Sequence, residues 1–538
     1  MSARNLARWL PAVLVGVAAF VAARWAMLPG LGYWDTAELQ TVAPILGTAH
    51  PTGFPTYVLL GWLANIVLTP FGEPALRMNL FAALSLAVAA AVTVDLVRAL
   101  TRSVALGVLA GIGLALTEVV WSIGTHAEAH ALHLALVAIL FRLLVAWEQR
   151  VRDDDATDRG DRGDRYLVAA AATFGLAMGN HSLTLLLAPA VALYVLAVDP
   201  LIFRRPRLVA ACAATLVAVV VLVFLELPLR AGPFRAALVY GRPETWDGFW
   251  YIALAEQFRG SLYQPFADLP GKLLDLVDRT VGAFGPLAAL VPLGFLATVV
   301  TRPRYALLSG SAAAITCFFA ASYVNAQIER YYLVPALIAW TWIAILAGTI
   351  VAAIGATIDP RHDDNAGAGA AAGAADGPVD GGGRGRRGRG LDPVLALGLA
   401  ATLLVPTAFA LPARLRAVDR SGDTAARRWV DRAIERMAPD AVIVSWWSFS
   451  TPLWYAQHVE GRRPDIVIID DRTRLDQELG DINDVIDANL ASRPVYVIRI
   501  DPSEVEALAA RYELEYLDGA NASSLTRVIG RRQAGSGS

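Results

Sequence analysis

Long apolar runs are the feature that most constrains this chain. A helix needs about 20 mostly apolar residues to cross a bilayer, and the sequence contains about eleven such runs. Hydrophobic residues make up 56% of the 538 residues and charged residues 17%, whereas soluble domains have about 25% charged residues. The sequence therefore predicts a polytopic α-helical membrane protein with about eleven transmembrane helices. The predicted spans are residues 9–28, 74–98, 104–122, 129–147, 166–180, 183–198, 208–227, 283–300, 305–323, 332–355 and 391–412.

Two apolar segments near the N-terminus need a separate interpretation. Residues 9–28 are interpreted as a retained span and not as a cleaved signal peptide, because the loop that follows is rich in functional groups. The run at 56–70 is too short and too closely bracketed by prolines to span comfortably, so we expect a helix lying in the membrane interface.

Arginine residues in the short loops predict the orientation. If the N-terminus is cytoplasmic, nearly all of these arginines fall on the inside, as the positive-inside rule requires. We therefore expect an integral protein of a bacterial-type plasma membrane with a cytoplasmic N-terminus. The inside arginines are Arg98, Arg102, those in 150–165, Arg204, Arg205, Arg207, Arg302, Arg304, Arg384, Arg386, Arg387 and Arg389.

The chain divides into four regions. Residues 1–358 form a membrane-embedded catalytic region with outer loops, and 391–412 form the last span. Between them, the Gly/Ala/Asp/Arg composition of 359–390 predicts a disordered cytoplasmic linker. Residues 413–538 alternate apolar strands with helical patterns, which predicts a small extracytoplasmic α/β domain with a parallel sheet.

Ionisable residues gather at the predicted outer ends of the spans. Ionisable groups at membrane depth are costly, so they are candidates for function. Each one alone could instead be a snorkelling side chain or a helix cap; their convergence on one face favours a site. The candidates are Asp35, Glu38, His50, His126, Glu128, His130, His181, Arg230, Arg330 and Tyr331.

Asp35 and Glu38 begin the first outer loop after the first span. Their i,i+3 spacing places two carboxylates on one helix face. The same spacing fits an N-cap with its capping-box partner, so spacing alone does not separate a cap from a catalytic pair.

The order of several short motifs resembles a known family. The motifs are His50-Pro51-Thr52-Gly53-Phe54-Pro55, Arg77-x-Asn79, Thr125-His126-Ala127-Glu128-Ala129-His130, Gly179-Asn180-His181, Leu227-Pro228-Leu229-Arg230, Trp246-Asp247-Gly248-Phe249, Arg330-Tyr331-Tyr332 and Glu460-Gly461-Arg462-Arg463-Pro464-Asp465. Together, over most of residues 30–470, they look like the polytopic protein O-mannosyltransferase-like family of GT-C glycosyltransferases.

The resemblance implies a GT-C-like fold and a membrane enzyme. The implied reaction moves a sugar, mannose by analogy, from a polyprenyl-phosphate donor to a protein Ser/Thr hydroxyl on the outer face with inversion. The same chemistry on a cell-envelope glycan or lipid is the alternative, and a lipid-linked-sugar transporter is the third hypothesis. The expected partners are the lipid donor, the acceptor and membrane lipid, without nucleic acid.

The residues fit this chemistry in named roles. Asp35 is the expected base for the acceptor hydroxyl, with Glu38 as its neighbouring carboxylate, because a carboxylate removed from bulk water accepts protons better. Arg230 and Arg330 are expected to neutralise the leaving phosphate. The remaining donor-binding candidates are His50, His126, Glu128, His130, His181 and Tyr331.

The histidines allow a metal as an alternative. His126, His130 and His133 recur on one helix face, and imidazole with carboxylate suits zinc or manganese. The spacing does not match a closed metal site, so we expect no cofactor and no metal.

The soluble tail is predicted to be dispensable for donor binding. Its resemblance to the family breaks at 448–451, where the family has an acidic pair. Trp446, Trp447 and Trp454 could form an acceptor platform, but packing in the core is the favoured interpretation.

Overall fold

A computed structural model describes residues 3–157, 163–325, 327–358, 391–519 and 523–532. The predicted linker at 359–390 lies outside the described residues. The helices of the membrane region are α1 (Ala3–Trp25), α2 (Trp34–Ile45), α3 (Pro55–Val67), α4 (Pro74–Thr101), α5 (Val104–Ala115), α6 (Glu118–Ser122), α7 (Ala129–Thr157), α8 (Asp164–Asn180), α9 (Ala188–Val198), α10 (Pro206–Phe224), α11 (Glu226–Ala231), α12 (Trp246–Ala253), α13 (Leu269–Phe284), α14 (Leu290–Thr301), α15 (Pro303–Ala320), α16 (Leu333–Ile358) and α18 (Pro393–Val418).

Each of the predicted spans contains a helix. Within the described residues, six helices are long and apolar enough to cross a membrane, and four apolar helices are shorter. The predicted number of eleven spans therefore stays a prediction. The six are Pro74–Thr101, Ala129–Arg152, Pro206–Ala231, Leu269–Thr301, Ile328–Thr357 and Pro393–Val418.

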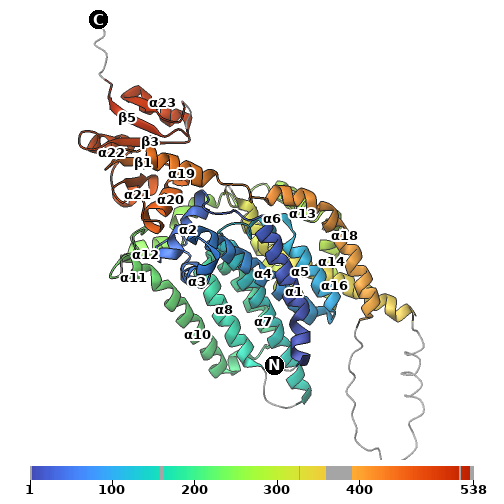
Figure 1. Cartoon of the computed structure of the whole chain (residues 1–538). Helices are drawn as coiled ribbons and strands as arrows, with labels where there is room; N and C mark the ends of the chain where they lie inside the picture. The colour runs from blue at the N-terminus through green and yellow to red at the C-terminus, as the bar shows by residue number, and fades with distance from the viewer. Residues whose placement is uncertain (1–2, 158–162, 326, 359–390, 520–522, 533–538) are drawn as a thin grey trace, which may run out of the picture.

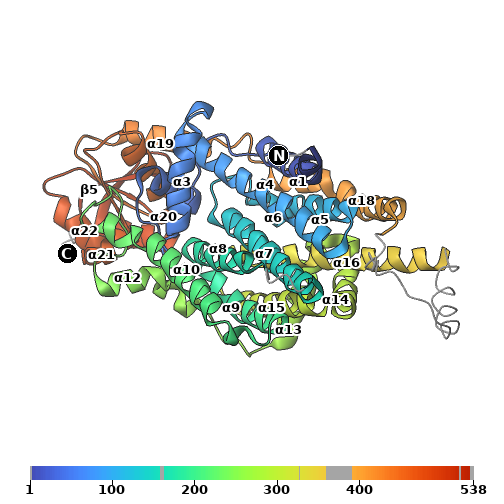
Figure 2. The same ribbon diagram turned by 90° about the horizontal axis from the view of Figure 1, so that it is seen from below.

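The apolar helices differ in what they face. Helix α7 packs against α4, α8 and α16 in the middle of the bundle (Figure 2). Within its most apolar 18-residue stretch, 83% of the residues are buried inside the protein. Helix α10 is more apolar, but only 11% of the residues in its most apolar 18-residue stretch are buried inside the protein. A helix that is apolar on all sides and uncovered by protein fits a lipid-facing position.

The C-terminal domain begins after α18 ends at Val418, beyond the predicted span end at 412. Its helices are α19 (Ala425–Arg436), α20 (Trp447–Trp454), α21 (Asp471–Asp476), α22 (Ile482–Asn489) and α23 (Pro502–Arg511). Its strands are β1 (Val442–Ser445), β2 (Val467–Asp470), β3 (Val495–Ile498), β4 (Tyr512–Tyr516) and β5 (Thr526–Arg531).

The sheet of this domain has the strand order β2-β1-β3-β5-β4. Strand β1 pairs in parallel with β2, Ser445 opposite Asp470, and with β3. These three are the strands that the sequence predicts. Strands β4 and β5 complete the sheet as an antiparallel pair that the sequence analysis does not identify.

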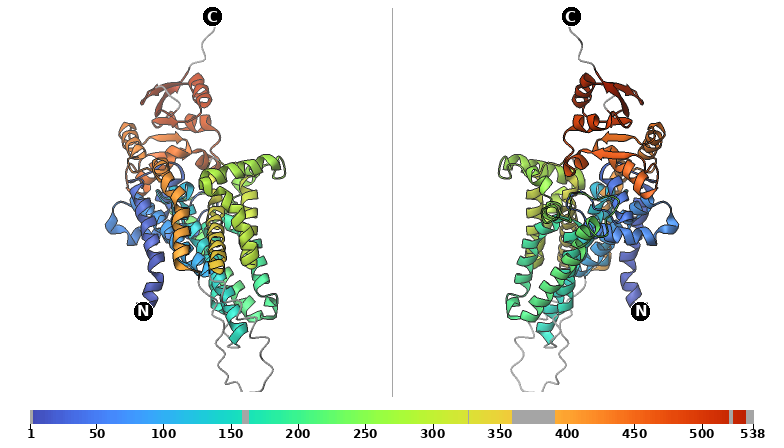
Figure 3. Two further views of the ribbon diagram at one scale, coloured as in Figure 1. Left: turned by 90° about the vertical axis from the view of Figure 1, so that its right-hand side faces the viewer. Right: turned by 90° about the vertical axis from the view of Figure 1, so that its left-hand side faces the viewer.

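The C-terminal domain sits on one end of the helical bundle (Figure 1). It lies beside α2 and α12, while the start of α1 points to the opposite end (Figure 3). The predicted interfacial segment at 56–70 contains the short helix α3, which packs on α2 and α4. This arrangement places the segment that carries α2 between the bundle and the sheet domain.

Candidate active site

A cavity of about 1280 Å³ lies where the loops at the end of the bundle meet the C-terminal domain. Its walls come from six separate parts of the chain, within 34–54, 128–130, 181–186, 240–262, 319–331 and 446–475. Its polar and aromatic lining includes Trp34, Asp35, His50, Glu128, His130, His181, Tyr240, Tyr251, Phe258, Arg259, Tyr323, Arg330, Tyr331, Trp446, Trp447, Asp470, Asp471 and Arg472.

Helix α2 presents Asp35 to this cavity. The N-cap of α2 is Tyr33, and no side chain caps its first turn, so Asp35 lies inside the helix and the alternative reading of Asp35 as an N-cap is wrong. One carboxylate oxygen lies 3.7 Å from Nη1 of Arg330. The other accepts a long hydrogen bond of 3.4 Å from the indole nitrogen of Trp447. Asp35 is partly exposed and is the carboxylate best placed to meet a hydroxyl in the cavity.

Glu38 lies one turn further along α2 and is fully buried. It accepts a 2.7 Å hydrogen bond from the backbone nitrogen of His50 and contacts the His50 ring nitrogen Nδ1. Burial raises the pKa of Glu38, and His50 partly offsets this rise. Burial would lower the pKa of His50, but the charge and hydrogen bond of Glu38 raise it to about 9. The two carboxylates of α2 thus differ: Glu38 holds the His50 loop, and Asp35 faces the cavity.

A second charged group stands across from Asp35. Arg330 places Nη1 2.8 Å from Oε2 of Glu128, and His130 donates from its backbone nitrogen to Glu128 at 3.2 Å, with its Nδ1 at 2.8 Å. Burial opposes ionisation of Glu128, yet Arg330 and His130 hold its pKa well below the usual range. Arg330 therefore bridges Asp35 and Glu128, two of the acidic side chains that line the cavity.

Aromatic rings form the wall next to this pair. The ring centroids of His130 and His181 are 4.7 Å apart, and Tyr331 lies 5.9 Å from His130. His181 accepts a hydrogen bond from the backbone nitrogen of Leu183 at its Nδ1. Flat rings of this kind suit the faces of a sugar or a prenyl chain. Six of the predicted donor-binding residues line the cavity, and their role in donor binding stays a prediction: His50, Glu128, His130, His181, Arg330 and Tyr331.

Two candidates are placed elsewhere. Arg230 donates to the carbonyl oxygens of Leu46 at 2.8 Å and Ile45 at 3.1 Å, which holds the C-terminal end of α2. His126 is buried with its Nδ1 3.2 Å from the Thr125 hydroxyl. Neither is among the described residues that line the cavity. These positions do not support a direct contact of Arg230 or His126 with the donor phosphate.

The sequence analysis misses the contribution of the C-terminal domain. Trp446 and Trp447 follow β1, and Asp470 to Arg472 end and follow β2; all of them line the cavity. Ligands of parallel sheets bind at the carboxyl ends of the strands. Applied to the runs DAVIVSWW and DIVIIDDR, this rule would have identified these residues from the sequence. Trp454 is a core residue with 3% exposure, as the core-packing interpretation expects. Trp446 and Trp447 are only half-buried and line the cavity, although Trp447 also packs against two apolar clusters.

One group in the described part of the chain could offer three metal ligands. Ligand atoms of Asp35, Glu38 and His50 lie within 4.8 Å of one another. Both oxygens of Glu38 already contact His50, which fits a closed ion pair better than an open coordination site. His126, His130 and His133, the sequence-based alternative, do not form such a group among the described residues.

Comparison with known proteins confirms the predicted resemblance. Residues 35–200 match the family model of the protein O-mannosyl-transferase TMEM260 N-terminal domain. A mouse protein, Protein O-mannosyl-transferase TMEM260, is 32% identical over 243 residues. That alignment covers 43% of this chain and 31% of the mouse protein, so the chain matches about a third of that relative.

Solved structures show the fold. ArnT from Cupriavidus metallidurans, bound to undecaprenyl phosphate, is 15% identical with a TM-score of 0.54, and the match covers 98% of each chain. The archaeal oligosaccharyltransferase AglB from Archaeoglobus fulgidus, in complex with an inhibitory peptide and a dolichol-phosphate, is 13% identical with a TM-score of 0.53. That match covers 99% of this chain and 75% of AglB. The chain is an integral membrane protein with a GT-C fold.

Proposed function

We propose that this protein transfers a sugar, mannose by analogy with the mouse relative, from a polyprenyl phosphate to a protein Ser or Thr hydroxyl. The observation that carries the proposal is the cavity in which Asp35 faces the Arg330–Glu128 pair at the loop end of the membrane bundle. In the proposed arrangement, this cavity lies at the headgroup level of the bilayer and opens to the space under the C-terminal domain. A lipid-borne donor and a soluble acceptor could meet there.

The proposed reaction is a direct displacement. Asp35 takes the proton of the acceptor hydroxyl while its oxygen forms a bond to the anomeric carbon of the sugar. The bond from that carbon to the phosphate oxygen breaks, and polyprenyl phosphate leaves. One base and one displacement invert the anomeric configuration. A positioned general base contributes about 10²–10⁴-fold in rate.

Arg330 is proposed to stabilise the departing phosphate. Its guanidinium faces the cavity and already bridges Glu128 and Asp35. Charge that grows on the phosphate in the transition state is stabilised by a fixed cation nearby. No metal is needed in this scheme, because Glu38 is held by His50 and Arg330 supplies the positive charge.

The proposed orientation has the N-terminus in the cytoplasm and the C-terminal domain outside a plasma membrane of the bacterial type. The distribution of arginines supports it. So does the position of the start of α1 at the end of the bundle opposite the C-terminal domain (Figure 3).

The purified full chain should be assayed with radiolabelled polyprenyl-phosphate mannose. Label in a co-purified or added membrane protein supports the proposal. Label in a glycan or lipid supports the alternative acceptor class. Movement of intact donor across the vesicle membrane without any labelled product would support transport. If neither labelled product nor donor movement is found, the proposed function is rejected.

A further inference from the structure

The C-terminal domain reaches directly into the cluster around Asp35. Trp447 begins α20 at the carboxyl end of β1, and its Nε1 donates to Oδ1 of Asp35 at 3.4 Å. The two residues are 412 positions apart in the chain. Since the other oxygen of Asp35 lies 3.7 Å from Arg330, the carboxylate is held between a side chain of the membrane region and one of the C-terminal domain.

The indole of Trp447 is itself held in place by rings from both regions. Its centroid is 6.0 Å from His50 and 5.5 Å from Tyr240, in edge-to-face arrangements. It is also 5.5 Å from Trp454. Edge-to-face contacts at these distances restrict ring orientation, so the N–H of Trp447 is aimed at Asp35 by its surroundings.

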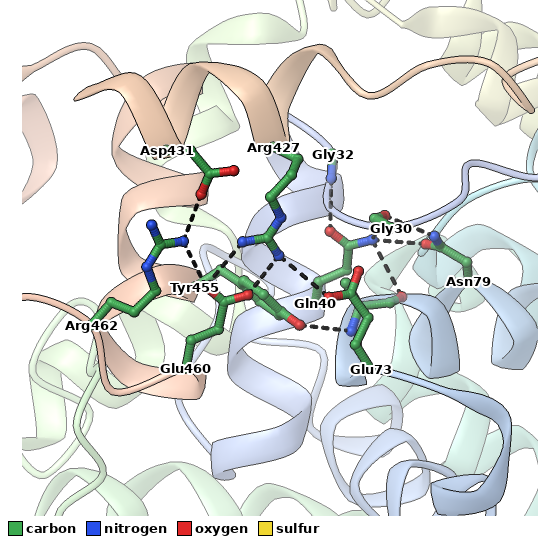
Figure 4. Close-up of polar contacts among 11 residues, drawn as sticks. Gly30, Gly32, Gln40, Glu73, Asn79, Arg427, Asp431, Tyr455, Glu460 and Arg462 are labelled. Atoms are coloured by element: carbon green, nitrogen blue, oxygen red, sulfur yellow. Dashed lines mark hydrogen bonds and ion pairs between the residues drawn. The ribbon is translucent and has the colours of Figure 1, made fainter. Parts of the chain in front are cut away.

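The attachment of the C-terminal domain to the bundle fixes α20 against α2. Figure 4 shows the polar part of this attachment. The Tyr455 hydroxyl accepts a 3.0 Å hydrogen bond from the backbone nitrogen of Ala75 at the start of α4. Arg427 of α19 lies 3.4 Å from Glu73 of the bundle and 2.5 Å from Glu460 of its own domain.

An apolar layer completes the attachment. Leu31, Ala37 and Ala75 of the bundle are buried in one cluster with Trp429 and Tyr455 of the C-terminal domain. Tyr33, the N-cap of α2, packs its ring 5.8 Å from Phe449 of α20. This buried surface therefore packs α2 and α20 into one shared core.

We propose that Trp447 is a positioning residue through which the C-terminal domain orients Asp35 for the reaction. This inference rests on the proposed function. The indole N–H and Arg330 together fix the direction in which the carboxylate points, so that its free lone pair faces the acceptor hydroxyl. Trp447 itself forms no bond with the reacting atoms.

The test removes the indole N–H of Trp447 and keeps an aromatic ring at that position. In Trp447→Phe, we expect kcat to fall about tenfold, since a hydrogen bond to a charged group corresponds to about a tenfold effect or more. KM for donor and acceptor should stay within about twofold, because the ring packing is largely kept. The acid limb of the pH–rate profile should move to higher pH, because a carboxylate that loses a donor is less stabilised in its charged form.

Two further variants sharpen the result. Site-specific replacement of Trp447 by 3-benzothienylalanine keeps the indole shape and removes only the N–H, and it should reproduce the effect even if Trp447→Phe fails to fold. Trp147→Phe is the matched control, because Trp147 is buried in α7, is not among the cavity-lining residues, and has no hydrogen-bond partner for its indole nitrogen among the described residues. We expect wild-type kcat and an unchanged pH profile for this control.

The outcomes separate the inference from the proposed function. If the wild type transfers mannose and the benzothienyl variant matches it in kcat and pH profile, the inference is wrong. If the wild type transfers nothing, the proposed function fails, and carbodiimide labelling of Asp35 in the intact protein decides the inference. Labelling that rises in the variants at a given pH supports the contact, and equal labelling overturns it.

Discussion

At the scale of single residues, two carboxylates on one helix face have different surroundings. Asp35 is partly exposed to the cavity, whereas Glu38 is fully buried against His50. The i,i+3 spacing gives both side chains the same face of α2 but does not determine their burial. The loop that carries His50 covers Glu38 and leaves Asp35 at the cavity, which supports the proposed role of Asp35 as the base.

Asp35→Asn should abolish nearly all transfer and leave donor binding intact. Asparagine keeps the size and can still accept from Trp447, but it cannot take a proton, so we expect a loss of about 10²–10⁴-fold in kcat. Radiolabel transfer and donor binding by the purified variant check this. Asp278→Asn, at an exposed carboxylate of α13, is the control. Wild-type turnover by Asp35→Asn would move the search for the base to Glu128.

The Glu38–His50 pair should make stability depend on pH. The pKa of His50 is raised from 6.5 to about 9 in the folded protein, so folding favours the protonated ring. This stabilisation is complete below about pH 6.5 and is lost as pH rises through about 9. At about 1.4 kcal/mol per pKa unit it amounts to at most about 4 kcal/mol.

The unfolding midpoint in detergent should therefore fall between pH 7 and 10, and Glu38→Gln should flatten this fall. If Glu38→Gln leaves the pH dependence of the unfolding midpoint unchanged, groups other than this pair cause that dependence. Glu38→Gln should also cost less transfer activity than Asp35→Asn at neutral pH.

Arg330→Lys should lower activity while donor binding persists. The guanidinium reaches Glu128 and Asp35 from one nitrogen and keeps further donors for a phosphate, whereas lysine is a single point charge. We expect kcat to fall about tenfold or more. Arg235→Lys, at an exposed arginine 3.9 Å from Glu244, is the control. Full activity of Arg330→Lys would make interfacial anchoring the better account of Arg330.

At the scale of elements, the position of α2 depends on one buried amide of α4. Asn79 donates to the carbonyl oxygens of Leu28 and Gly30 at 2.9 and 3.0 Å. It accepts from Gln40 of α2 and from the backbone nitrogen of Ala127, both at 2.8 Å. One side chain thus joins the end of α1, helix α2 and the Glu128 loop (Figure 4 shows its contacts with Gly30 and Gln40).

Asn79→Ala should therefore destabilise the protein strongly. It removes the partner of the buried Leu28 carbonyl and of the Ala127 N–H, each loss costing about 1–3 kcal/mol, while Gln40 keeps its hydrogen bond to the Gly30 carbonyl. The unfolding midpoint in detergent should drop clearly. Ser85→Ala on the same helix removes only a hydrogen bond to Phe81 within α4, and we expect a much smaller change. Equal midpoints for the two variants would contradict the bridging role of Asn79.

At the scale of the whole molecule, the C-terminal domain is part of the cavity and not an appendage. Arg427→Glu should loosen its attachment, because the substitution places a third negative charge beside Glu73 and Glu460. Trypsin should then cut faster at the exposed link after α18, at Arg420, and transfer should fall. Arg511→Glu, which disturbs a pair with Asp487 inside the domain, should leave this cleavage rate unchanged.

This test is preferable to deleting residues 413–538. Deletion would expose Leu31, Ala37 and Ala75, which are buried under the domain, and would remove Trp447 from Asp35. The sequence-based prediction that donor binding survives such a deletion remains a prediction. For that prediction to hold, the donor must bind to the half of the cavity that Arg330, Glu128 and His130 form.

The sequence by itself determined the membrane class, the helical segments, three of the five strands and the convergence of ionisable residues such as Asp35, Glu128 and Arg330. The length of a membrane span, the period of a helix and the alternation of a strand are all visible within a short stretch of sequence, so local patterns predict them. Only the tertiary structure decided that Glu38 is buried, that Arg230 holds the end of α2, and that Trp446 and Trp447 line the cavity. These outcomes depend on surfaces that meet across hundreds of residues, and no local pattern encodes which faces of the bundle and the sheet domain fit together.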